Sequence, residues 1–193
     1  MVIAAHIIFT ARGFWLPNDP RGSWSDFVAA WELVRFGKAT RVTDRRSFAR
    51  DPHDVEKRWA AKRALKYPPV RFNGYQAQSV VRGFIRAVNE SGYVILACAI
   101  LHDHVHLVVA RHARLFEQIT AHLKGGATQQ LRAEGLHPYQ SYPALPSPWA
   151  EGLWKVYCDN VGHVRNAIEY VEQNPVREGK RKQRWRFVVP FEG

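Results

Sequence analysis

The chain has 193 residues, of which 46% are hydrophobic and 23% charged, values typical of one globular domain rather than of a disordered chain. It carries 28 Lys and Arg residues against 17 Asp and Glu residues, which gives a net charge of +11. This excess of positive charge favours an anionic partner, most often a nucleic acid. Two cysteines outside any CxxC pair argue against a disulfide framework, and no apolar stretch approaches the roughly 20 residues of a membrane span.

Hydrophobic periodicity predicts alternating strands and helices along the chain. The predicted strands, rich in β-branched and aromatic residues, are 3–10, 93–101, 104–110 and 153–157. The predicted helices are 54–66, 74–89, 113–131 and 161–174. Residues 16–50 are interpreted as an inserted segment, with a short helix over 27–34 and a basic stretch over 38–50. This order predicts an α+β fold, in which an antiparallel sheet carries helices mainly on one face.

Single residues refine two of these helices. Gly125 and Gly126 predict a break in the helix that contains them, because glycine disfavours helix interiors. Pro175 disfavours helical geometry at the preceding residue, so we expect the last helix to end at Asn174. The side chain of Asn174 would then be available to bind an ion or to cap the helix.

Two histidines one residue apart, His104 and His106, follow a long apolar run. In a strand, residues i and i+2 lie on the same face. The two imidazoles are therefore expected side by side, while Val105 points the opposite way. Two neighbouring imidazoles on a rigid strand can bind a metal ion, but half-buried structural histidines produce the same pattern. The rest of the chain has to decide between these interpretations.

A tyrosine and an amide, Tyr170 and Asn174, are four residues apart and share one face of the last predicted helix. Two imidazoles and one amide oxygen can hold a hard cation such as Mg²⁺ or Mn²⁺ and leave positions open for phosphate oxygens. Such an ion polarises a phosphate as a Lewis acid, and Tyr170 can then attack the phosphorus as nucleophile. A free phenol has a pKa of about 10, so a nearby cation would help to form the phenolate.

Two motifs resemble a known family. The sequence His-Val-His at 104–106, followed by an apolar strand, resembles the HUH motif, in which a hydrophobic residue separates two histidines. The sequence Tyr-Val-Glu-Gln-Asn-Pro-Val-Arg at 170–177, with Gly-Leu-Trp at 152–154, resembles the C-terminal signature of single-tyrosine insertion-sequence transposases. The resemblance extends to the first strand at 5–10 and is closest to the branch of REP-associated tyrosine transposases.

This resemblance implies a ferredoxin-like (RNA-recognition-motif-like) antiparallel sheet, the fold of HUH endonucleases and transposases. It also implies an enzyme that cleaves and rejoins single-stranded, hairpin-associated DNA through a 5′-phosphotyrosine intermediate and with a divalent metal, Mg²⁺ or Mn²⁺. Position by position, His104, His106 and Asn174 correspond to the metal ligands, and Tyr170 corresponds to the nucleophile. Related enzymes have glutamine at the position of Asn174, and Gln173 is one residue away from it, so Gln173 is the second choice for the third ligand.

The domain organisation implied by the resemblance is a single HUH transposase domain over residues 1–176, with the insertion at about 16–50, and a basic C-terminal tail over 177–193. The expected partner is single-stranded or hairpin DNA, with no membrane, and a homodimer is compatible with the family. Residues 1–6 lack the features of a signal peptide, so we expect a cytoplasmic, nucleoid-associated protein of bacterial type. Basic grooves and stacked aromatic rings hold single-stranded DNA. The candidates for this role in the tail are Arg177, Lys180, Arg181, Lys182, Arg184, Trp185 and Arg186.

His102 departs from the family pattern, which commonly has proline there. It shares the alternation of His104 and His106, so the segment also resembles the histidine-triad nucleotide hydrolases, which would need neither a metal nor Tyr170. Asp103 breaks that alternation. A hydrolytic zinc site is disfavoured because no glutamate base lies beside the pair in an H-E-x-x-H or H-x-E arrangement. The remaining alternative is a domesticated protein that binds hairpin DNA without cutting it.

Overall fold

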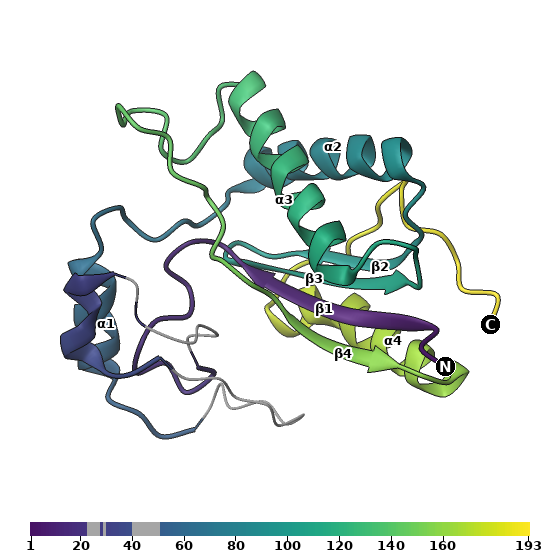
Figure 1. Cartoon of the computed structure of the whole chain (residues 1–193), viewed down its shortest axis with the longest axis horizontal. Coiled ribbons are helices and arrows are strands. Elements are labelled where there is room, and N and C mark those ends of the chain that lie inside the picture. Colours follow the sequence, from purple (N-terminus) through teal and green to yellow (C-terminus); the bar gives the residue numbers. More distant parts are fainter. Residues whose placement is uncertain (23–27, 29, 40–50) are drawn as a thin grey trace.

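The computed structural model describes residues 1–22, 28, 30–39 and 51–193. They form a four-stranded antiparallel sheet with helices on both faces, which confirms the predicted α+β class. Helices α2 and α3 lie over one face of this sheet and α4 lies under the other (Figure 1). The elements are β1 (Ala4–Thr10), the 3₁₀ helix η1 (Trp31–Phe36), α1 (Val55–Ala64), α2 (Gly74–Ser91), β2 (Ile95–Ile100), β3 (His104–Ala110), α3 (Phe116–Ala133), β4 (Trp154–Cys158) and α4 (Val161–Arg177).

The first strand of the chain lies in the middle of the sheet. The strand order is β2-β3-β1-β4, so β1 pairs with both β3 and β4. In the antiparallel register, Ile8 lies opposite His106 and Thr10 lies opposite His104. This pairing brings β1 alongside the two histidines of the predicted motif.

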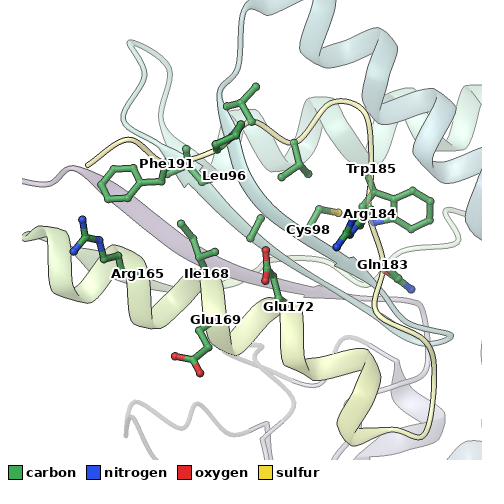
Figure 2. Close-up of a pocket in the computed structure, with 14 residues that line it drawn as sticks. Leu96, Cys98, Arg165, Ile168, Glu169, Glu172, Gln183, Arg184, Trp185 and Phe191 are labelled. Atoms are coloured by element: carbon green, nitrogen blue, oxygen red, sulfur yellow. The ribbon is translucent and has the colours of Figure 1, made fainter.

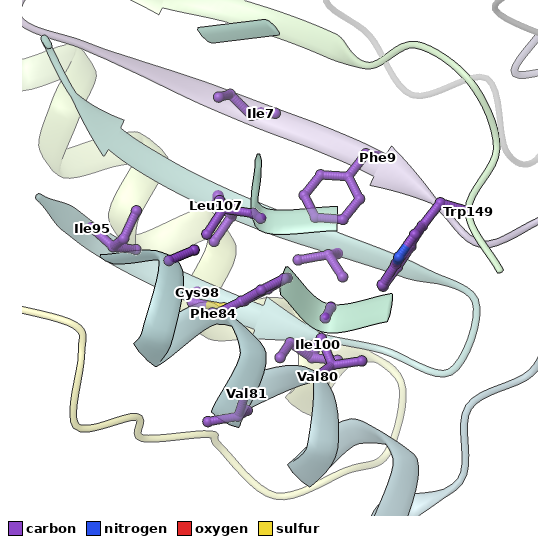
Figure 3. Close-up of a cluster of buried hydrophobic side chains, with 14 of the residues drawn as sticks. Ile7, Phe9, Val80, Val81, Phe84, Ile95, Cys98, Ile100, Leu107 and Trp149 are labelled. Carbon is purple, nitrogen blue, oxygen red and sulfur yellow. The ribbon is translucent and has the colours of Figure 1, made fainter. Parts of the chain in front are cut away.

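Alternate residues of the central strands enter two separate cores, as strand geometry requires. Ile7 and Phe9 enter the larger core beneath α2 and α3, where they lie with Phe84 (Figure 3). Ala4 of β1 and Val108 of β3 belong to the smaller core beneath α4. The even-numbered residues of β1 and β3 therefore face α4.

Helices α2 and α3 cross where Gly83 meets Gly126. A Cβ atom added to Gly83 would lie 2.5 Å from the Cα atom of Ala127, and one added to Gly126 would lie 2.8 Å from the carbonyl oxygen of Gly83. Glycine at both positions permits this close approach of the two backbones. Helix α3 runs through Gly125 and Gly126 without interruption, so the predicted break is wrong. Packing against α2 outweighs the low helix propensity of glycine.

Helix α4 extends to Arg177, so the prediction that it ends at Asn174 is wrong. Pro175 lacks the N–H group that would donate to the carbonyl oxygen of Val171, so α4 forgoes one backbone hydrogen bond in its last turn. The backbone N–H of Glu178 donates to the carbonyl oxygens of Asn174 and Pro175, at 3.3 and 3.1 Å, and these bonds complete the turn. Gly179 then leaves the helix with a left-handed φ of 71°.

The predicted insertion is described only in part. Its described helix is η1, over Trp31–Phe36, which overlaps the second half of the helix predicted over 27–34. Residues 27 and 29 of that predicted helix, and residues 40–50 of the predicted basic stretch, lie outside the described residues. Leu33 and Phe36 of η1 pack with Ala61 of α1 in a small core of their own. The described part of the insertion and α1 therefore pack together in a core separate from the sheet.

The C-terminal segment, residues 178–193, runs along the outer edge of β2. The side-chain amide of Gln183 donates to the carbonyl oxygen of Ile100 and accepts from its N–H, both at 2.8 Å, as a neighbouring strand would. The N–H of Val189 donates to the carbonyl oxygen of Ile95 at 2.9 Å, and Phe187 is buried in the larger core. These contacts attach the segment firmly to the sheet.

Both cysteines are free thiols in the structure. Cys98 and Cys158 are buried at β2 and at the end of β4, and burial raises the pKa of each thiol above its usual range. They therefore behave as small apolar core residues. Over the described ranges, no helix combines the length and the apolar character needed to traverse a bilayer.

Candidate active site

Three histidines lie together on the sheet face that α4 covers. His104 and His106 extend from β3 and His6 extends from β1. The ring centroids of His104 and His106 are 4.9 Å apart, and the rings of His6 and His106 stack at 5.4 Å. The predicted side-by-side arrangement of the pair is thus present, with a third imidazole beside it.

The imidazoles of His6 and His106 are buried and joined by a hydrogen bond. Nε2 of His6 lies 3.1 Å from Nδ1 of His106, so one ring donates and the other accepts. Burial lowers the pKa of His6 to about 4. Burial, followed by the charges of His104 and His6, lowers the pKa of His106 well below its usual range. Both rings are therefore neutral at pH 7, which is the state in which imidazole binds a metal.

Asp103 orients His104 from the turn between β2 and β3. Its Oδ1 accepts a hydrogen bond from Nδ1 of His104 at 2.8 Å. Burial raises the pKa of Asp103, but the hydrogen bond to His104 and the positive charges of His104, His102 and Arg71 outweigh it and lower the pKa overall. Because Nδ1 of His104 is engaged, Nε2 is left to bind an ion, the usual arrangement of a metal-binding histidine in proteins.

Tyr170 extends from α4 over the histidines. The centroid of its ring lies 5.4 Å from that of His6 and 5.8 Å from that of His106. The next residue, Val171, is fully buried and fixes this part of α4 against the sheet. Tyr170 itself is 39% exposed, so a large substrate can reach it. The guanidinium carbon of Arg177 lies 5.1 Å from the centre of the tyrosine ring, which places a cation beside the phenol.

Asn174 follows Tyr170 by one helical turn, on the same side of α4, and is half-buried. Gln173 is also half-buried but points about 100° away around the helix. Over the described residues, no three His, Cys, Asp or Glu side chains converge on a point that could hold a metal ion. An ion at this place would depend on the histidine pair and an amide oxygen. The donor set suits that role, because both imidazoles of the pair have one nitrogen engaged and the other left to bind.

His102, which the sequence left without a role, lies in the turn before β3 rather than on the strand. Its Nε2 lies 3.3 Å from Oδ2 of Asp103, and its Nδ1 lies 3.4 Å from Nζ of Lys180 and 3.7 Å from Oε2 of Glu178. His102 thus connects the histidine-bearing turn with the residues that follow α4. The histidine-triad alternative required three histidines alternating along one strand. In the described segment 102–106, only His104 and His106 belong to the strand.

Two residues of the site, His6 and Phe14, were missed by reasoning from the sequence. His6 is a lone polar residue in an apolar strand, and that was the available signal for it. Only the pairing of β1 with β3 brings it to His106. Phe14 is buried and stacks on His104, with ring centroids 5.1 Å apart and planes 2° from parallel. Nothing in the sequence distinguishes Phe14 from an ordinary core aromatic residue.

The basic residues proposed for DNA binding are mostly on the surface. Arg177 belongs to α4, and the others follow it in the C-terminal segment. Lys182 pairs with Glu172 at 2.6 Å, and Lys180 pairs with Glu178 at 2.6 Å. The exposed members of the set are Arg177, Lys180, Arg181, Lys182, Arg184 and Arg186.

Trp185 differs from the rest of this set because it is partly buried. It lines a groove of about 550 Å³ between α4 and the C-terminal segment, together with Arg184 (Figure 2). It also packs against the larger core, and its Nε1 is buried without a hydrogen-bond partner among the described residues. This burial favours a packing role for Trp185 over base stacking. The α4 residues that line the groove lie on the side of the helix away from Tyr170; they are Arg165, Ile168, Glu169 and Glu172.

Comparison with known proteins gives structural neighbours only: no protein-family model and no curated protein matches the chain. The chain is similar to a REP-associated tyrosine transposase solved with a bound REP hairpin, at 14% identity and a TM-score of 0.48, over 92% of this chain and 68% of that one. It is also similar to a candidate transposase from Deinococcus radiodurans R1, at 11% identity and a TM-score of 0.39, over 95% and 94%. Both neighbours are described as transposases, the family that the histidine and tyrosine motifs resemble. At these identities and scores, the function of the chain has to be argued from its site.

Proposed function

We propose that the chain is a metal-dependent tyrosine transposase that nicks and rejoins single-stranded, hairpin-associated DNA. The observation that carries the proposal is the contact of Tyr170 with the buried histidines. The ring centroids of Tyr170 and His106 are 5.8 Å apart. A nucleophile beside neutral imidazoles, on a chain with a net charge of +11, suits a reaction on the phosphate of a nucleic acid.

In the proposed first step, the phenol oxygen of Tyr170 attacks the phosphorus of a single strand. The bond from phosphorus to the 3′ oxygen breaks, and a 5′-phosphotyrosine and a 3′-hydroxyl form. The phenol releases its proton to solvent and the departing oxygen takes one up, so no co-reactant is consumed. Arg177 lies over the tyrosine ring and stabilises negative charge on it. Attack by a 3′-hydroxyl on the phosphotyrosine reverses the step. No ATP is needed, because the ester bond to tyrosine replaces the ester bond that was broken.

His104, His106 and Asn174 would hold the divalent ion, Mg²⁺ or Mn²⁺. When bound, that ion supplies Lewis-acid polarisation of the phosphate. The chain prepares the ligands in advance: Asp103 engages Nδ1 of His104, and His6 engages Nδ1 of His106. These second contacts fix the ring orientations, as they commonly do around metal sites.

The experiment is a covalent-adduct assay with Mn²⁺ and hairpin oligonucleotides taken from the DNA that flanks the gene. The wild-type protein is expected to form an adduct that survives denaturing electrophoresis. Tyr170→Phe is expected to lose the adduct and to keep hairpin binding, because the nucleophile alone is removed. Tyr75→Phe is the matched control, since Tyr75 is 80% exposed on α2, over the opposite face of the sheet, and should leave the adduct unchanged.

The metal ligands are tested in the same assay. His104→Ala and His106→Ala are each expected to abolish the adduct at any Mn²⁺ concentration, and Asn174→Ala should reduce its yield more than Gln173→Ala. A stronger effect of Gln173→Ala would move the third ligand to that residue. Tight hairpin binding by the wild-type protein with no adduct on any substrate would instead favour the domesticated, non-cleaving DNA-binding protein.

A further inference from the structure

Helix α1 lies beyond the end of the sheet at which β1 ends and β3 begins, the end that carries His104 (Figure 1). The chain leaves β1 through Gly13, which has a φ of 80°. A Cβ atom on Gly13 would lie 2.9 Å from both the side chain of Leu65 and the backbone of Pro69, so the residues after α1 pack directly on this turn. Phe14 follows and stacks on His104. Helix α1 is thus attached to the wall of the candidate active site.

Lys62 of α1 extends toward this wall. Its Nζ lies 5.8 Å from the ring centre of Phe14 and 5.5 Å from that of Trp59. Burial lowers the pKa of Lys62, while the carboxylates of Asp103 and Asp19 raise it, so its charge lies within electrostatic reach of the carboxylate that orients His104. Over the part of the chain that the structure describes, the ammonium group of Lys62 has aromatic neighbours but no ion pair or hydrogen bond. A half-buried cation in this state favours an anion as an additional partner.

Trp59 lies one helical turn before Lys62, on the same face of α1. It is 48% exposed, which is unusual for an indole. Single-stranded nucleic acids are held by the combination of a cation for the backbone phosphate and an open aromatic ring for the base. Trp59 and Lys62 supply both groups side by side.

We propose that Trp59 and Lys62 form a nucleotide subsite beside the candidate active site. In this subsite Lys62 binds a backbone phosphate of single-stranded DNA, and Trp59 stacks on the adjacent base. Phe14 forms the wall between the subsite and His104. The assignment of the strand rests on the proposed function, because a strand attacked by Tyr170 has to continue past the histidines. The subsite holds a phosphate other than the one that reacts, so it contributes to affinity and alignment.

The subsite predicts two different binding signatures for a fluorescein-labelled oligothymidylate, measured by anisotropy over a series of salt concentrations. Lys62→Gln should weaken binding and make the slope of log K against log salt shallower by about 0.7, because one phosphate contact is lost. Trp59→Leu should weaken binding by roughly 5- to 100-fold with the slope unchanged, because stacking involves no counterion. Lys66→Gln and Trp31→Leu are the matched controls and should bind like the wild-type protein. Lys66 also lies over an aromatic ring, that of Tyr67, and Trp31 is 84% exposed on η1.

Folding of each variant is checked by its circular dichroism spectrum and melting temperature, and a bromodeoxyuridine oligonucleotide gives an independent readout on the unaltered protein. Photocrosslinking should attach the oligonucleotide to the peptide that contains Trp59. Crosslinks confined to other peptides, or binding by Lys62→Gln and Trp59→Leu equal to that of their controls, would overturn the subsite. These measurements do not require cleavage. If the two variants show their expected signatures while the wild-type protein forms no adduct, the result would therefore contradict the proposed function and leave the subsite standing.

Discussion

Lys124 is a half-buried cation with backbone partners. Its Nζ donates to the backbone carbonyl oxygens of Ala150 and Gly152, at 2.9 and 2.7 Å, and lies 5.2 Å from the ring centre of Phe9. Burial lowers the pKa of Lys124 to about 8, although the negative charge of Glu151 acts in the opposite direction. The ammonium group therefore fixes the backbone that leads into β4. Its lowered pKa means that the charged form is less favourable in the folded protein than in the unfolded chain.

The lowered pKa of this half-buried lysine predicts that stability rises with pH in alkaline solution. The folded-state pKa is about 8 and the usual value is 10.5, so the unfolded chain binds more protons between these values and unfolding becomes less favourable as pH rises. From pH 8 to 9.5 the free energy of unfolding should increase by about 2 kcal/mol from this group. Urea unfolding of the wild-type protein and of Lys124→Met at both pH values measures the difference, with the exposed Lys66→Met as control. Equal pH slopes for wild type and Lys124→Met would contradict the assignment.

At the level of residues, the sequence predicted those site members that belong to a local pattern. His104 and His106 could be paired because strand geometry fixes the relation of residues i and i+2, and Tyr170 and Asn174 because helix geometry fixes that of i and i+4. His6 could not be added, because its position depends on the register between β1 and β3. Their assigned roles in metal binding and catalysis remain predictions.

The crossing of α2 and α3 depends on two small residues rather than on large apolar ones. The carbonyl oxygen of Gly126 lies 2.6 Å from the position that a Cβ atom on Gly83 would occupy, so the helices approach backbone to backbone. Gly125, the neighbour of Gly126, is exposed, and a Cβ atom there would meet nothing within 4 Å. Adjacent glycines in one helix therefore have opposite roles.

We expect Gly83→Ala to destabilise the protein by about 3 kcal/mol, because the helices must separate to admit the methyl group. Gly125→Ala should stabilise it by up to about 1 kcal/mol, since alanine is the better helix former and the site is open. Chemical denaturation of both variants and of the wild-type protein gives the free energies. Comparable effects of the two substitutions would show that helix propensity, and not the crossing, determines their consequences.

At the level of elements, hydrophobic periodicity predicted most helices and strands to within a few residues, and β3 begins and ends where it was expected. The errors have tertiary causes. The helix α3 continues past Gly125 and Gly126 because α2 packs there, and α4 continues past Asn174 because Glu178 completes its last turn. Sequence periodicity contains no information about either contact. The fold class was predictable because it depends on the order of elements alone.

At the scale of the whole molecule, the C-terminal segment combines two properties: it carries positive charge on the surface and it makes apolar contacts with the core. Arg181, Arg184 and Arg186 are exposed, while Phe187 is buried in the larger core and Gln183 closes the edge of β2. Deleting residues 177–193 would remove all of these contacts together. A loss of DNA binding after such a deletion could then result either from the lost positive charges or from unfolding of the protein.

Neutralising the charges separates the two contributions. The triple variant Arg181→Gln, Arg184→Gln, Arg186→Gln should bind single-stranded DNA with a salt slope shallower by as much as about 2, at roughly 0.7 for each phosphate contact, and its melting temperature should be unchanged. Phe187→Ala should instead lower the free energy of unfolding by about 3–5 kcal/mol through the cavity it leaves. An unaltered salt slope in the folded triple variant would show that these arginines do not contact the DNA backbone.

The central position of β1 also has a consequence for the timing of synthesis. Strand β1 leaves the ribosome long before its partners are made, since Ala4 pairs with Ala110 of β3 and with Cys158 of β4. At translation rates of about 5–20 residues per second, that interval is on the order of ten seconds. His6 cannot meet His106 until then, and Tyr170 emerges later still. A nascent chain therefore cannot assemble the candidate active site until Tyr170 has been synthesised.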